Sequence, residues 1–67
     1  MYMAFIGGWD SVAAFSEDEK TAKKLAIREK KRYCKDDLDK WSWNNVKDYY
    51  GAWVQEVKEG TVITEGL

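Results

Sequence analysis

The chain has 67 residues and a net charge of −1, with one cysteine, Cys34, and no histidine. We expect a chain of this length to fold as a single compact domain, residues 1–67, with a thin core. One cysteine excludes an intrachain disulfide, and the lack of histidine removes the usual Cys/His zinc sites and the commonest general acid–base residue. We therefore predict no enzymatic activity, no catalytic residue, no metal site and no cofactor.

The first part of the chain is typical of a β-hairpin. Residues 2–6 are all apolar and predict a strand that is buried on both faces. Residues 12–15 form a second short apolar run, and the two runs are joined by a glycine-containing segment, residues 7–11. Two such runs separated by a turn predict a pair of antiparallel strands.

The clearest predicted element is a helix over residues 17–33. Ser16 and Glu19 have the spacing of a capping box, and the acidic start and basic end of the segment suit the helix dipole. At 100° per residue, one side of this helix faces the sheet through a narrow stripe: Ala22, Leu25, Ala26, Glu29 and Tyr33.

The remaining elements follow in chain order. Residues 36–39 predict a polar connection or the start of a short helix. Ser42 is a plausible N-cap for a helix over residues 43–50, which Gly51 ends. Residues 52–58 predict a third strand and residues 61–64 a possible fourth. The order β-β-α-α-β-β predicts an α+β fold, with a small antiparallel sheet of three to four strands packed against one long and one short helix.

The positive charge is concentrated in the long predicted helix. Residues 20–35 hold eight basic side chains and one acidic one, a charge of +7, so the rest of the chain carries −8. The outer side of the helix presents a basic ridge, Lys20, Lys23, Lys24, Ile27 and Lys31. A solvated helix face, an acidic protein patch and the phosphates of a nucleic acid or nucleotide are all consistent with it. We expect Asp36, Asp37 and Asp39 to neutralise the basic helix end rather than to bind a cation.

The segment from residue 41 to residue 53 is the densest aromatic stretch. Trp41, Trp43, Tyr49 and Tyr50 alternate with asparagine and aspartate, a mixture typical of protein-binding surfaces, and we predict them as partner-binding residues. The alternative is that Trp43, Val46, Tyr50 and Trp53 close the core over the sheet. We expect about half of the rings to lie inside, with Trp41 and Tyr49 exposed, and Cys34 to pack as a small hydrophobe.

In size, aromatic richness and charge segregation the chain resembles the small accessory proteins that bacteriophages encode. Such proteins are commonly stoichiometric inhibitors of host defence or metabolism, including anti-CRISPR proteins. The resemblance rests on no motif, so it implies no site residues. The leading hypothesis is a non-enzymatic inhibitor that blocks a host protein, acting in the host cytoplasm and not on a membrane. The alternatives are a module that binds nucleic acid or nucleotides through the basic helix, and a structural component that forms homodimers or larger homo-oligomers.

Overall fold

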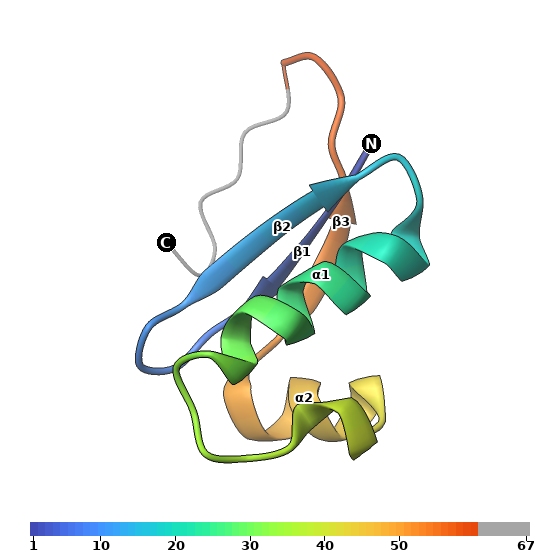
Figure 1. Cartoon of the computed structure of the whole chain (residues 1–67). Coiled ribbons are helices and arrows are strands. Elements are labelled where there is room, and N and C mark those ends of the chain that lie inside the picture. The colour runs from blue at the N-terminus through green and yellow to red at the C-terminus, as the bar shows by residue number, and fades with distance from the viewer. Residues whose placement is uncertain (61–67) are drawn as a thin grey trace.

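The computed structural model describes residues 1–60 and contains a three-stranded antiparallel sheet with two helices (Figure 1). In chain order the elements are β1 (Tyr2–Ile6), β2 (Val12–Ser16), α1 (Glu19–Lys31), the short 3₁₀ helix η1 (Leu38–Lys40), α2 (Trp43–Tyr50) and β3 (Trp53–Glu56). The predicted α+β class is confirmed, with strand order β2-β1-β3. The possible fourth strand at residues 61–64 lies outside the described residues.

The central strand β1 contributes apolar side chains to both faces of the sheet. Ala4 pairs with Ala14 on β2 and with Val54 on β3, and its side chain belongs to the core beneath the helices. Successive strand residues point to opposite faces, so Phe5 lies on the other side of the sheet. There its ring stacks on Trp53, with the centroids 5.4 Å apart. The expectation that Trp53 helps to close the helix-covered core is therefore wrong, because its register with Phe5 places it on the opposite face.

Helix α1 begins two residues later than predicted. The Asp18 carboxylate accepts a hydrogen bond from the Thr21 backbone N–H at 2.9 Å, so Asp18 is the N-cap. Ser16 is the last residue of β2, paired with Tyr2, which is why it does not cap the helix and the capping box with Glu19 is not formed. The helix also ends at Lys31 rather than at residue 33.

The face of α1 that meets the sheet also differs from the predicted stripe. Its buried residues are Ala22, Ala26 and Lys30, at i, i+4 and i+8, whereas Leu25 and Tyr33 are exposed. Ala22 and Ala26 are small, so the helix backbone approaches β1 and β2 closely. Lys30 is buried at the edge of the core, next to the turn between β1 and β2.

Helix α2 is confirmed with its predicted bounds and caps. The Ser42 hydroxyl accepts a hydrogen bond from the Asn45 backbone N–H at 3.2 Å. At the other end Gly51 adopts a left-handed conformation, with φ of 75°, and its N–H donates to the Lys47 carbonyl. Val46 is fully buried and joins α2 to the same core as α1.

The core is built from small and aliphatic side chains rather than from rings. Its buried cluster consists of Ala4, Ile6, Val12, Ala22, Ala26, Leu38, Val46 and Ala52. Of the ten aromatic residues, all within the described part, only Phe5 is buried. The aromatic surface of this protein is therefore largely outside the core, on the sheet and at one end of the molecule.

Candidate functional site

The most exposed ring in the described part belongs to Trp9, in the turn between β1 and β2. Its exposed fraction is 93%, which is unusual for a tryptophan. Gly8 has φ of 89°, a conformation that side chains disfavour, and the Ser11 hydroxyl donates to the Gly8 carbonyl at 3.0 Å. Gly7 lies so close to α2 that a Cβ there would be 2.8 Å from the Tyr50 carbonyl oxygen. These constraints give the turn one shape and place the indole at its tip.

A buried lysine holds this turn against the end of α1. The Lys30 side chain is 1% exposed, and its Nζ donates to the Trp9 carbonyl at 2.5 Å and to the Asp10 carbonyl at 3.2 Å. The ammonium also lies 5.1 Å from the centre of the Tyr50 ring, within the range of a cation–π contact. Lys30 therefore joins three segments: the β1–β2 turn, α1 and the C-terminal end of α2.

These three segments surround a cavity of about 390 Å³. Exposed rings from each of them line it: Trp9 from the turn, Tyr33 from the residues after α1 and Tyr49 from α2, with exposed fractions of 93%, 53% and 70%. Lys30 and Tyr50 form its inner wall. We call the surface formed by Trp9, Tyr33, Tyr49 and Tyr50 the aromatic end.

Tyr50 is fixed in the wall of this cavity by a hydrogen bond. Its hydroxyl donates to a carboxylate oxygen of Asp36 at 2.5 Å. This bond, together with partial burial, raises the pKa of the Tyr50 phenol, so the ring stays neutral. The neighbouring Tyr49 ring meets Tyr50 edge to face at a centroid distance of 4.8 Å. The exposed ring is thus supported by a fixed one, an arrangement suited to an anchor in an interface.

A second hollow of about 380 Å³ continues the aromatic end along α2. Trp41, Asn45, Asp48 and Tyr49 line it, so Tyr49 borders both hollows. Trp41 is half-buried, and its ring lies 5.6 Å from Tyr49, edge to face. The combined surface alternates rings with an amide and a carboxylate, which suits contact with another protein.

The structure brings together three of the four predicted partner-binding residues. Trp41, Tyr49 and Tyr50 form one cluster, whereas Trp43 lies apart, half-buried against the core with the Lys23 ammonium 5.4 Å from its ring. Trp41 and Tyr49 were both expected to be exposed. Tyr49 is exposed, whereas Trp41 is half-buried.

Sequence reasoning missed Trp9 and Tyr33. A tryptophan at the tip of a Gly-Gly-Trp-Asp turn is a signal that could have found the first, because turn tips lie at the surface. No comparable local signal marks Tyr33, since its place beside the cavity depends on where α1 ends.

The predicted basic ridge separates into paired and unpaired charges. Lys23 is 3.6 Å from Glu19, and Lys31 is 2.6 Å from Asp39 and 3.3 Å from Asp37. The hydrogen bonds that Lys31 donates, first to Asp39 and then to Asp37, raise its pKa. Lys20 and Lys24 make no ion pair within residues 1–60. Part of the ridge is therefore neutralised within the chain.

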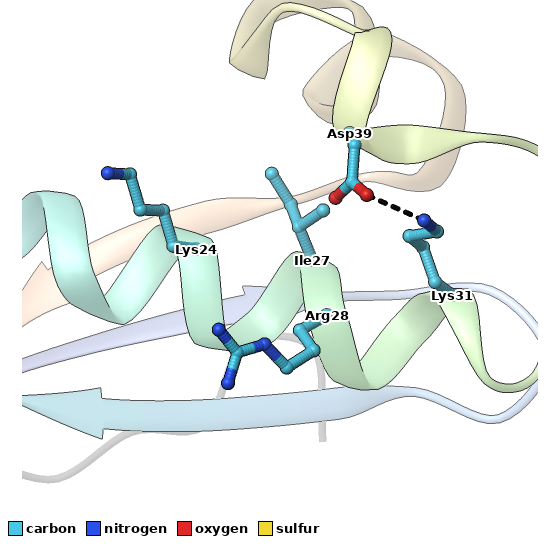
Figure 2. Close-up of a pocket in the computed structure, with 5 residues that line it drawn as sticks. All are labelled: Lys24, Ile27, Arg28, Lys31 and Asp39. Carbon is cyan, nitrogen blue, oxygen red and sulfur yellow. Dashed lines mark hydrogen bonds and ion pairs between the residues drawn. The ribbon is translucent and has the colours of Figure 1, made fainter.

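Three members of the ridge line a further hollow of about 460 Å³ (Figure 2). We call this hollow the basic pocket; its lining residues are Lys24, Ile27, Arg28, Lys31 and Asp39. Figure 2 shows Lys31 turned toward Asp39, while Lys24 and Arg28 extend away from that carboxylate. Arg28 was not among the predicted ridge residues.

The three aspartates between the helices all have partners inside the chain. Asp37 and Asp39 pair with Lys31 and so offset the basic helix end as expected, whereas Asp36 instead accepts a hydrogen bond from the Tyr50 hydroxyl. Cys34 is half-buried next to this group and packs against the core, as expected.

No protein-family model, curated protein or solved structure matches this chain. Within residues 1–60, neither helix has the length and apolar character that crossing a membrane requires. A function for this chain is therefore inferred from the chemistry of its aromatic end.

Proposed function

We propose that this protein binds another protein through its aromatic end and acts by covering a site on that partner. The observation that carries the proposal is the placement of the exposed rings. Four aromatic side chains are exposed in the described part, Trp9, Phe15, Tyr33 and Tyr49, and three of these line a single cavity. Exposed rings grouped around one hollow are typical of the anchor residues of a protein interface.

The support beneath these rings favours recognition of a protein surface. Lys30 fixes the turn that carries Trp9, and Asp36 fixes Tyr50 behind Tyr49. The Tyr49 ring and the backbone that carries Trp9 are therefore ordered before binding, so less conformational freedom is lost when a partner docks and more of the contact energy is available for affinity. A chain of this size that docks by one end would block its partner by occlusion, as the inhibitor hypothesis supposes.

Affinity purification with a matched control tests this proposal. The tagged parent, a Trp9→Ala/Tyr49→Ala variant and a Phe15→Ala variant are each used to recover proteins from a lysate of the cells that express the gene. Phe15 is the matched control, because its ring is 52% exposed but lies on β2, away from the cavity. We expect a partner that the parent and Phe15→Ala both retain and that the double variant loses.

Binding measurements with the purified partner then give the change in affinity that each variant causes. The Trp9→Ala/Tyr49→Ala variant, which lacks two interface anchors, should raise Kd by at least about 30-fold, while Phe15→Ala should change Kd by less than about threefold. Circular dichroism of each variant checks that the fold is kept. The proposal fails if every recovered protein binds all three forms equally. It also fails if sedimentation shows that the aromatic end pairs with a second copy of this chain instead.

A further inference from the structure

The basic residues of α1 that are exposed and form no ion pair lie in one row. Among the described residues Lys20, Lys24 and Arg28 have no acidic group within ion-pair distance, whereas Lys23, Lys31 and Arg32 pair with carboxylates and Lys30 is buried. The three unpaired residues lie at i, i+4 and i+8, so they follow one stripe of the helix at steps of about 6 Å. The helix therefore offers a ligand three cations in a single stripe, fewer than the net charge of +7 over residues 20–35 suggests.

The last two members of this row border the basic pocket. Lys24 and Arg28 line it together with Lys31 and its partner Asp39; in Figure 2 the side chains of Lys24 and Arg28 extend in different directions from α1, and half-buried Ile27 lies between Lys24 and Lys31. Asp39 offsets only one of the three cations, so the pocket keeps a net positive charge. The pocket thus combines a guanidinium, an ammonium and an apolar contact.

We propose that the basic pocket binds a small ligand that carries a phosphate group, independently of the aromatic end. The Arg28 guanidinium has the geometry to contact two phosphate oxygens, and Lys24 supplies a second charge. Ile27 packs against the organic part of the ligand. A phosphate ester therefore binds more tightly than inorganic phosphate.

The surroundings favour a compact anion over a nucleic-acid strand. Glu17, Asp18 and Glu19 precede Lys20 at one end of the row, and Asp37 and Asp39 flank the pocket at the other. A strand that continued beyond the pocket in either direction would meet further carboxylates, whereas a ligand with one phosphate group would meet only Asp39, which is already paired with Lys31.

Titration of the ¹⁵N-labelled protein with adenosine monophosphate at low salt tests the inference. We expect saturable amide shifts confined to residues 24–31 and around residue 39, with weaker binding of inorganic phosphate at the same residues. Arg28→Gln and Lys24→Gln should each weaken the binding of adenosine monophosphate about tenfold, because each removes a charged hydrogen-bond donor. Lys47→Gln is the matched control, an exposed lysine on α2 without an ion pair in residues 1–60, and should leave the affinity unchanged.

Several results would overturn the inference. One is the lack of saturable shifts with millimolar adenosine monophosphate, and another is an equal loss of affinity in Lys47→Gln and Arg28→Gln. A single-stranded oligonucleotide that binds more than about 100-fold tighter than adenosine monophosphate would assign the ridge to nucleic acid instead. The variants lie on the exposed side of α1, and their circular dichroism spectra check that the helix is intact.

Discussion

Replacing Lys30 with methionine tests how the aromatic end is held. Methionine keeps the unbranched stem in the core but removes the Nζ donor, so the Trp9 and Asp10 carbonyls lose a charged partner. A hydrogen bond from a charged donor contributes about 1.5–3 kcal/mol to the unfolding free energy, as measured by comparing a variant with its parent. Two effects oppose the loss: water can reach the exposed turn, and the variant no longer buries a charge. We expect a net decrease in unfolding free energy of about 1.5 kcal/mol.

Thermal unfolding followed by circular dichroism measures this change. For a domain of this size 1.5 kcal/mol corresponds to a decrease in Tm of roughly 6–12 °C. Lys47→Met is the control, since the same replacement on the exposed side of α2 should change stability by less than about 0.5 kcal/mol. A Lys30→Met variant as stable as the parent would refute the role of the buried ammonium, and would mean that the turn holds its shape without it.

Three further predictions concern the hydrogen bonds of Tyr50 and Asp18. Tyr50→Phe removes the donor to Asp36 but keeps the ring, and should lower the unfolding free energy by about 1.5 kcal/mol in urea denaturation; unchanged stability would show that this bond contributes nothing. In the parent, the absorbance change of Tyr50 ionisation should occur above pH 10, because its hydrogen bond to Asp36 raises its pKa. The Asp18 pKa is lowered by hydrogen bonds from Thr21, so this carboxylate stabilises the fold above its unfolded pKa, and the contribution is lost as pH falls through the folded value. The stability of Asp18→Asn should therefore fall less steeply than that of the parent below pH 4, and parallel curves would contradict the assignment.

Local signals in the sequence were sufficient for α2 but not for the start of α1. Ser42 and Gly51 cap α2 as predicted, because no other element competes for them. Ser16 and Asp18 are both good N-cap residues, and the choice between them depends on the pairing of Ser16 with Tyr2 fourteen residues earlier. The pairing of Ser16 with Tyr2 across the sheet therefore sets the start of α1, which the capping pattern alone places two residues earlier.

The candidate sites were predictable where residues are neighbours in sequence. Tyr49 and Tyr50 are consecutive, so their proximity follows from the sequence, whereas Trp41 precedes the N-cap of the same helix and its contact with Tyr49 does not follow from helical geometry alone. The burial of Lys30 was not predictable, because a lysine in the last turn of a basic helix normally points to solvent. Its partners are carbonyls in a turn twenty residues away, and only the packing of β1 and β2 beneath α1 brings them within reach.

The separation of the rings from the core bears on whether they serve stability or binding. A small domain has few ways to gain stability, and aromatic burial is among the largest of them. Here alanines and aliphatic residues fill the space between sheet and helices, and nine of the ten rings remain wholly or partly accessible. Trp9 and Tyr49 are so exposed that truncating them to alanine should cost less than about 0.5 kcal/mol of stability. The same truncations should cost at least about 2 kcal/mol of binding if the aromatic end is an interface. A variant that keeps its Tm but loses its partner would assign these rings to recognition, and one that loses both equally would assign them to the fold.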